Sequence, residues 1–391
     1  MKKILGLLLA LCLIAGCTSA FAAGTPVEQV KIGYITIGDE NEGYSANHLN
    51  GLKEAQKALG ISDDQVLCKY NVPETEDAYE AAIDLAEQGC NIIFATSFGH
   101  ESYVFQAAEE YPNIQFCHAT GTAAMSSPLN NVHNYFYAVY ESRYVSGVVA
   151  GMKLAQMIED GTITADAAKI GYVGAFPFAE VISGFTSFFL GARSQCPSVT
   201  MEVRYTNSWA DMALEKETAE ALIADGCVLI SQHADTTGAP SACEAAGVPC
   251  VGYNISMLPV APNTALTSAA GDWGAYVTYA VKCLIDGEEI ARDWCKGYAE
   301  GAVYTTELND SIVAPGTAEK VAELEAGFKA GTVKVFDTSA FTVNGETLTS
   351  YTTAYGLDGI EMVSDGEFHE SSVRSAPYFD ILIDGITAVV E

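Results

Sequence analysis

The sequence is poor in basic residues. It contains 19 Lys and Arg against 50 Asp and Glu, which gives a formal net charge of −31. A surface this acidic repels phosphate backbones and anionic lipid headgroups. We therefore expect no nucleic-acid partner, and any attachment to a membrane must come from something other than surface charge.

Long apolar segments are also scarce. One apolar run, from Ile4 to Ala15, follows Lys2 and Lys3 and is too short to cross a bilayer as a helix. A positive end followed by a short apolar run is typical of an export signal. We predict that residues 1–16 form this signal and that the protein is exported.

The stretch "IAGC", which ends at Cys17, resembles a bacterial lipobox. The resemblance implies that Cys17 becomes the lipidated first residue and that residues 17–28 form a tether to the outer face of the cell membrane. More than one acyl chain makes such an anchor stable. The alternative is a soluble secretory signal with a chance cysteine.

The sequence contains no Cys-x-x-Cys pair. Nine cysteines follow Cys17, and several lie inside apolar segments, so we expect most of them to be small core residues. Cys283 and Cys295 could form a disulfide. The nine are Cys68, Cys90, Cys117, Cys196, Cys227, Cys243, Cys250, Cys283 and Cys295.

The common catalytic and cofactor motifs are missing. There is no Gly-x-Ser-x-Gly, no phosphate-binding glycine loop, and no pair of His at metal-binding spacing among the six His. We therefore predict that the protein binds no metal or cofactor and is not an enzyme.

Several segments occur twice. "KIGYI" at 31–35 recurs as "KIGYV" at 169–173, and "EQGCNIIFATSF" at 87–98 recurs as "ADGCVLISQHAD" at 224–235. Each apolar segment adjoins a stretch with helical periodicity, so strands and helices alternate. Such alternation is typical of an α/β fold with parallel sheets. The sequence predicts two doubly wound, Rossmann-like lobes joined by a hinge.

We assign residues 29–135 and 262–298 to the N-terminal lobe, and residues 136–261 and 299–391 to the C-terminal lobe. Ligands of parallel sheets bind beyond the carboxyl ends of the strands. In two facing lobes these ends meet in one cleft, which makes the loops after the strands candidate site segments.

Aromatic side chains are frequent in these loops. Stacking of a flat ligand ring on an aromatic side chain contributes about 1–3 kcal/mol per base in nucleic-acid complexes. The alternative is that the rings pack beneath the loops as core. Tyr44 and Trp209 are the best candidates for stacking; the loop aromatics are Tyr44, Phe98, Phe176, Phe178 and Trp209.

His233 and Asp235 follow an apolar run and precede "TGAP". They could belong to a metal site or a catalytic relay, but no third group with suitable spacing accompanies them. A neutral His and an ionised Asp form a donor and acceptor pair suited to the edge of a heterocycle. An Asp that caps the next helix and a His bonded to the backbone is the structural alternative.

Taken in order, "EGYSANH" (42–48), "FCHATG" (116–121), "NSWAD" (207–211) and "QHADT" (232–236) resemble one family. It is the basic membrane protein family of bacterial substrate-binding lipoproteins. The resemblance implies a type I periplasmic binding protein fold, no catalysis, and delivery of a purine base or nucleoside to an ABC permease by a monomer.

Two positions differ from the nucleoside-binding relatives. The resemblance implies an Asp and a Lys on the ribose hydroxyls, whereas this chain has Asn254 and Gly271. Loss of a charged clamp weakens ribose binding, so we predict a free purine-type base, with a nucleoside as the alternative.

We predict that Tyr44 and Trp209 stack on the ligand ring while four side chains bond to its edge: His118, Thr120, His233 and Asp235. The complete predicted site is Tyr44, Asn47, His48, Phe98, His118, Thr120, Phe176, Glu180, Trp209, His233, Asp235, Asn254 and Trp273. A nucleoside hydrolase-like enzyme and a ligand sensor for a membrane receptor are rival functions.

Overall fold

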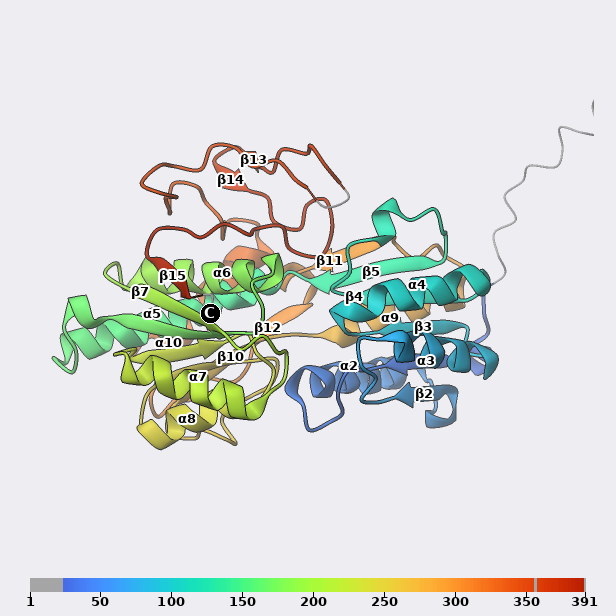
Figure 1. The fold of residues 1–391 in the computed structure, drawn as a ribbon, viewed down its shortest axis with the longest axis horizontal. Helices are drawn as coiled ribbons and strands as arrows, with labels where there is room; N and C mark the ends of the chain where they lie inside the picture. Colours follow the sequence, from blue (N-terminus) through green and yellow to red (C-terminus); the bar gives the residue numbers. More distant parts are fainter. Residues whose placement is uncertain (1–23, 355–356, 390–391) are drawn as a thin grey trace, which may run out of the picture.

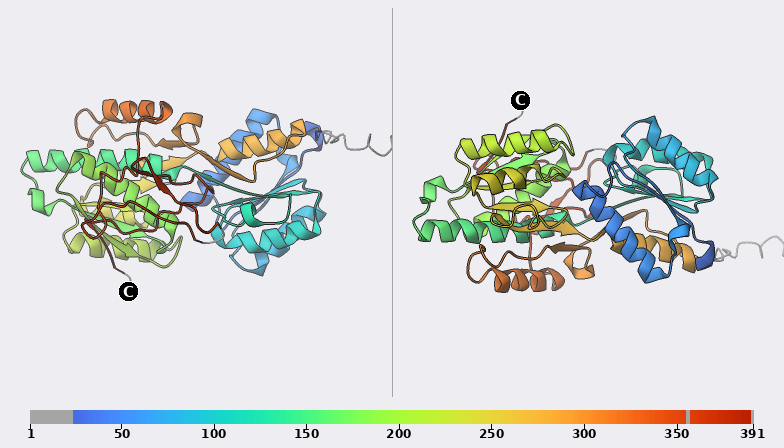
Figure 2. Two further views of the ribbon diagram at one scale, coloured as in Figure 1. Left: turned by 90° about the horizontal axis from the view of Figure 1, so that it is seen from above. Right: turned by 90° about the horizontal axis from the view of Figure 1, so that it is seen from below.

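The computed structural model describes residues 24–354 and 357–389. Two lobes lie side by side, and each is a parallel sheet with helices on both faces (Figures 1 and 2). This confirms the predicted α/β fold. The predicted signal, Cys17 and most of the tether lie outside the described residues.

The first sheet is wholly parallel in the described part of the chain, with the order β11-β5-β4-β3-β1-β2. Its helices cover it as the pairs α2 with α9 and α3 with α4. The bounds are β1 Ile32–Ile35, α2 Gly43–Leu59, β2 Val66–Lys69, α3 Glu76–Glu87, β3 Ile92–Ala95, α4 Glu101–Glu110, β4 Gln115–Ala119, β5 Val132–Tyr137, α9 Trp273–Asp286 and β11 Asp293–Lys296.

The second sheet repeats this order, β10-β9-β8-β6-β7, with β12 and β15 at its edges. Only β12 is antiparallel among its described strands. The bounds are α5 Val139–Glu159, β6 Lys169–Gly174, α6 Ala179–Gln195, β7 Thr200–Tyr205, α7 Met212–Ala224, β8 Leu229–Gln232, α8 Gly238–Ala246, β9 Cys250–Tyr253, β10 Ala265–Gly271, β12 Val303–Thr305, α10 Thr317–Lys329 and β15 Ile386–Val389.

Short 3₁₀ helices and a small hairpin complete the secondary structure of the described residues. They are η1 Val27–Gln29, η2 Asp63–Gln65, η3 Phe98–His100, η4 Ala124–Ser126, η5 Ala165–Ala167, η6 Tyr298–Glu300, β13 Val363–Ser364 and β14 Glu367–Phe368.

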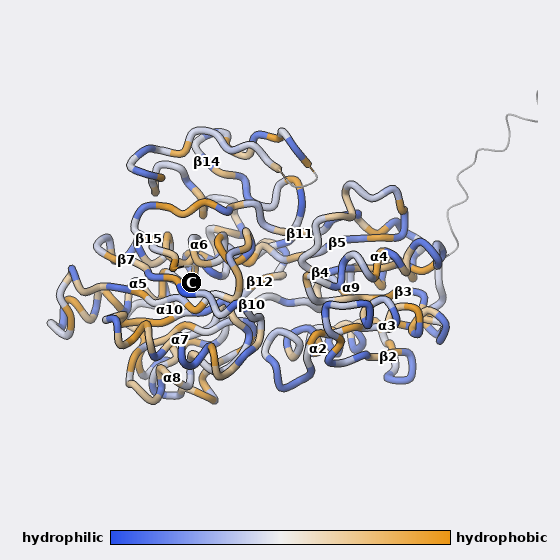
Figure 3. The backbone as a smooth tube through the Cα atoms, in the orientation of Figure 1, coloured by the Kyte–Doolittle hydropathy of each residue, from blue (hydrophilic) through white to orange (hydrophobic). Residues whose placement is uncertain are grey.

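Both faces of each central strand are buried, which explains why the strands are apolar throughout. In β3, Ile92 and Phe94 pack into one core while Ile93 and Ala95 pack into another, on the opposite face of the sheet. Along the outer helices hydrophobic and hydrophilic segments alternate instead (Figure 3), because one side of each faces solvent.

The chain crosses between the sheets where β5 leads into α5, where β10 leads into α9, and where β11 leads into β12. The sequence assigns residues 262–298 to the first lobe, and this is wrong for β10. That strand pairs with β9 and β12 in the second sheet. Its run "ALTSAAG" consists mostly of small residues and has a single β-branched residue, Thr267, so the sequence signal for a strand is weak.

A tail of about sixty residues follows α10 and covers the outer side of α6 (Figure 1). Its end returns to the second sheet as β15, parallel to β7. Ser183 on α6 donates a hydrogen bond to the buried Glu370 of the tail at 2.8 Å. Ser375 donates to Asp293 on β11 at 2.6 Å, so the tail contacts both lobes.

The nine described cysteines are free, and seven of them are buried. Cys283 and Cys295 are among the free ones, so the pairing considered from the sequence is wrong. Within the described residues, no helix is both long enough and apolar enough to cross a membrane.

Candidate functional site

A narrow cavity lies between the lobes; the empty space of about 360 Å³ in and around it includes open solvent at its mouth. The wall comes from both lobes, at the carboxyl ends of strands. It consists of Ile37, Tyr44, Ser97, Phe98, Thr120, Glu180, Trp209, His233, Asp235 and Tyr253.

Two of the cavity's aromatic rings come from opposite lobes. Tyr44 lies in the first turn of α2, and its hydroxyl donates to the carbonyl of Thr96 at 2.6 Å. Trp209 follows β7 and packs against Phe176, with ring centroids 5.0 Å apart and planes at 62°. These contacts fix both rings at the cavity wall.

Asp235 is held in the wall by Asn254, whose Nδ2 donates to Asp235 Oδ1 at 2.7 Å. Burial raises the pKa of the Asp235 carboxyl well above its usual value, and the negative charges of Glu42, Glu215 and Glu180 raise it further. The proton affinity of this carboxyl is therefore unusually high.

His233 and Glu180 form a second polar pair, with Nε2 and Oε1 3.4 Å apart. Burial raises the pKa of Glu180 to about 7, opposed by the positive charge of Arg143. Burial holds the pKa of His233 well below its usual value, and Arg143 lowers it further. His233 is therefore a neutral ring at pH 7, able to donate at one nitrogen and accept at the other.

Two residues that follow equivalent strands have a left-handed backbone. Thr120 after β4 and Asn254 after β9 both have φ of 65°. Asn adopts this conformation readily, but a β-branched residue does so rarely. Local strain of this kind is common at ligand sites. Here it lies at Thr120, and Asn254 has the same backbone conformation at the equivalent place in the other lobe.

Seven of the thirteen predicted residues line the cavity: Tyr44, Phe98, Thr120, Glu180, Trp209, His233 and Asp235. Phe98 lies at the mouth, 41% exposed, with its ring centroid 5.6 Å from that of Phe178 on the other lobe.

Three residues near α2 and α9 are outside the cavity wall. His48 stacks on Trp273 with centroids 3.9 Å apart, and its Nδ1 lies 2.9 Å from the hydroxyl of Tyr34. Both rings are core. Asn47 donates instead to the carbonyl of Gly271 at 3.0 Å, joining α2 to the second sheet.

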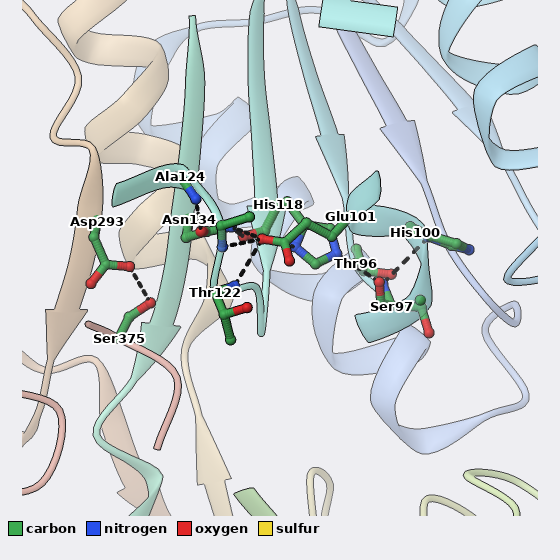
Figure 4. Close-up of polar contacts among 12 residues, drawn as sticks. Thr96, Ser97, His100, Glu101, His118, Thr122, Ala124, Asn134, Asp293 and Ser375 are labelled. Carbon is green, nitrogen blue, oxygen red and sulfur yellow. Dashed lines mark hydrogen bonds and ion pairs between the residues drawn. The ribbon is translucent and has the colours of Figure 1, made fainter. Parts of the chain in front are cut away.

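His118 is also absent from the wall. It is fully buried, and its Nε2 lies 2.7 Å from the carbonyl oxygen of Ser97. Glu101, 3.9 Å from its other ring nitrogen, accepts hydrogen bonds from Asn134 and the backbone of Thr122 (Figure 4). His118 therefore belongs to a network that holds the loops after β3 and β4.

Phe176 and Asn254 support the site from behind, through Trp209 and Asp235 respectively. Three further residues line the cavity without having been predicted from the sequence: Ile37, Ser97 and Tyr253. Ser97 and Tyr253 lie in or beside candidate loops, and the carboxyl end of a strand is the signal that could have identified all three.

The described residues contain no group of three or more His, Cys, Asp or Glu placed to hold a metal ion. What the wall offers is aromatic surface, a neutral imidazole, two carboxyl groups and the hydroxyl groups of two Tyr, one Ser and one Thr. These groups can bind an aromatic ring and hydrogen-bond to its edge.

Two known proteins are similar to this chain over most of its length. A purine-binding protein of Brucella abortus is 33% identical over 79% of this chain and 83% of its own. A putative ABC transporter glucose-binding protein of Haloferax volcanii is 30% identical over 80% of this chain and 76% of its own.

Among solved structures, an ABC transporter solute-binding protein of Aeropyrum pernix superposes with a TM-score of 0.66 at 17% identity. The alignment covers 78% of this chain and 93% of the other. A transcriptional activator of the comK gene from Bacillus halodurans has a TM-score of 0.61 at 20% identity, over 76% and 97%. These likenesses show the two-lobed fold.

The model of one protein family, Bmp, described as ABC transporter substrate-binding protein PnrA-like, matches residues 34–328. The matched range holds both sheets except β1's first two residues and the edge strand β15. The chain belongs to this family of ABC transporter substrate-binding proteins, whose role is to bind a substrate and not to transform it.

Proposed function

We propose that the protein binds a free purine-type base between its lobes and delivers it unaltered to an ABC permease. It acts as a monomer attached to the outer face of the cell membrane through lipid on Cys17. The similarity to a purine-binding protein and the "IAGC" motif support these two statements. Mass spectrometry of the membrane fraction tests the lipid.

The observation that carries the proposal is the composition of the cavity wall. Tyr44 and Trp209 offer rings from opposite lobes, and Asp235, Glu180 and His233 offer hydrogen-bonding groups from the second lobe. A purine base presents two aromatic faces and an edge of N–H donors and ring-nitrogen acceptors. Such a wall matches both features.

Two neighbouring positions favour a base over a nucleoside. The amide of Asn254 donates a hydrogen bond to Asp235. Residue 254 therefore offers no carboxylate that could accept hydrogen bonds from a ribose diol. A Cβ on Gly271 would lie 2.3 Å from the ring of Tyr137, so a Lys fits at this position only if Tyr137 moves. The charged ribose clamp expected of nucleoside-binding relatives has no counterpart at either position.

Calorimetry of the mature protein against adenine, guanine, hypoxanthine, their nucleosides and glucose tests the proposal. We expect a base to bind most tightly, and Trp209→Ala to weaken its binding at least about tenfold, the loss expected from one stacking face. Trp209→Phe keeps an aromatic face and serves as the matched control. Tight binding of nucleosides or glucose without binding of a base would overturn the proposal.

A further inference from the structure

Arg143 on α5 is entirely buried. One of its terminal nitrogens, Nη1, donates to the carbonyl of Gln232 at 2.6 Å. Among the described residues it has no carboxylate within ion-pair distance, and its Nε and Nη2 lack hydrogen-bond partners. Burying a charge is costly unless another charge compensates it, so a compensating group is expected nearby.

The guanidinium lies directly behind the cavity wall. Its central carbon is 3.7 Å from the ring centroid of Tyr253, which lines the cavity. A Cβ on Gly184 would meet both His233 Nδ1, at 2.6 Å, and Arg143 Nε, at 3.7 Å. Arg143 and His233 therefore both lie against the backbone of Gly184.

The charge of Arg143 acts on both members of the His233 and Glu180 pair. It stabilises the ionised form of Glu180, which burial opposes, and it destabilises the protonated form of His233. Glu180, the carboxyl group on which Arg143 acts, lines the ligand cavity.

We propose that Arg143 is a positioning residue for ligand binding: its charge favours the carboxylate form of Glu180 and disfavours a protonated His233, so that the wall accepts hydrogen bonds from ligand N–H groups. This deepens the proposed function and rests on it only for the nature of the ligand. Arg143, Glu180, His233 and Tyr253 all belong to the second lobe, so their arrangement does not depend on lobe closure.

Other titratable groups also face Glu180, and they act in one direction. The negatively charged forms of these groups oppose ionisation of Glu180, whereas the positive charge of Arg143 favours it. They are Asp235 after β8, Tyr253 on β9, Tyr44 on α2 and Tyr137 on β5.

Carbon-13 NMR titration of the Glu180 carboxyl in the ligand-free protein tests the proposal directly. Removal of the positive charge in Arg143→Met should raise the Glu180 pKa by at least about one unit, a tenfold loss of carboxylate below the midpoint. Arg143→Lys keeps a charge and should restore a midpoint close to that of the wild type. Glu180→Gln identifies the resonance.

The ligand affinity provides the second readout. For a purine compound that does not itself titrate in this range, affinity should fall as the pH drops through about 7. Arg143→Met should move that midpoint upward, Arg143→Lys should leave it close to that of the wild type, and Glu180→Gln should remove it. If the role of Arg143 were merely structural, Arg143→Met would lower the ligand affinity equally at every pH.

An unchanged Glu180 pKa in Arg143→Met would overturn the proposal. If that variant does not fold, the double variant Arg143→Met/Glu180→Gln removes both charges and should fold, because neither is left uncompensated; its failure would also count against the proposal. Absence of purine binding would refute the proposed function but leave the pKa measurement valid.

Discussion

At the scale of the single residue, Asn254 is notable because its role differs from the one that the sequence suggests. Its amide donates to Asp235 at 2.7 Å in a buried setting, where an amide costs less to bury than a charge. Replacing one amide nitrogen by oxygen would put two carboxyl groups in contact. The residue at 254 therefore controls the charge that Asp235 can carry.

We predict that Asn254→Asp makes stability depend on pH. Two buried carboxyls in contact share one proton, so their folded-state pKa lies above that of the unfolded chain. The folded form then binds protons more tightly, and stability falls as the pH rises through the raised pKa. Thermal unfolding at pH 5 and pH 8 should show an additional loss of about 1–3 kcal/mol at pH 8 relative to the wild type.

Asn50→Asp, the same change at an exposed position, is the control and should shift stability by less than about 0.5 kcal/mol. A pH-independent effect of Asn254→Asp would mean that the two side chains do not share a proton.

Local sequence predicts which residues follow a strand, but not how deep each one lies. Tyr44 and His48 are one turn apart on α2 and on the same face. Tyr44 lines the cavity, whereas His48 lies deeper and stacks on Trp273. That difference depends on α9, which comes more than two hundred residues later, so no local pattern contains it.

At the scale of the element, α5 and α6 pack unusually closely. A Cβ on Gly147 would lie 2.0 Å from the carbonyl oxygen of Phe188, and one on Gly191 would lie 2.1 Å from that of Tyr144. Backbone therefore meets backbone at this crossing. The helix pair carries Arg143 and Glu180, so its spacing also sets the geometry behind the cavity.

We predict that Gly147→Ala destabilises the protein by about 1–3 kcal/mol, the usual effect of overpacking. Ala favours a helix by about 1 kcal/mol over Gly, so any net loss comes from the steric clash. Urea denaturation measures it. Glu159→Ala on the exposed end of α5 is the control; a stabilised Gly147→Ala would mean that the helices separate at little cost.

The repeated strands were predictable because parallel strands buried on both faces need continuous apolar residues. "KIGYI" and "KIGYV" do form the equivalent strands β1 and β6. β10 was misplaced because its small residues fit between neighbouring strands without an apolar signature. Its place in the second sheet depends on long-range pairing, for example with β12, which no local sequence pattern shows.

At the scale of the whole molecule, the tail after α10 adds contacts outside the residues that the family model matches. Glu370 accepts hydrogen bonds from Ser183 in the second lobe and from the backbone of Tyr378 and Phe379. Ser375 reaches Asp293 on the first sheet, as Figure 4 shows. The tail thus spans the hinge from outside, on elements that also carry the cavity.

The cavity itself is closed by contacts between lobes that leave no room for a side chain. Gly43 at the start of α2 donates to the carbonyl of Asp235 at 3.1 Å. A Cβ on Gly43 would lie 2.8 Å from the same oxygen. Closure therefore requires glycine at this position, for steric reasons and not for its dihedral angles.

We predict that Gly43→Ala weakens ligand binding about tenfold, mainly through faster dissociation. The added methyl group would hold the lobes apart and destabilise the closed state by about 1.4 kcal/mol. The methyl group meets only the opposite lobe, so the unfolding free energy without ligand should change by less than about 0.5 kcal/mol. Stopped-flow dissociation and chemical denaturation measure the two effects. Asn50→Ala, exposed on the same helix, is the control. Equal losses of stability and affinity would place the clash within the first lobe and contradict this account of closure.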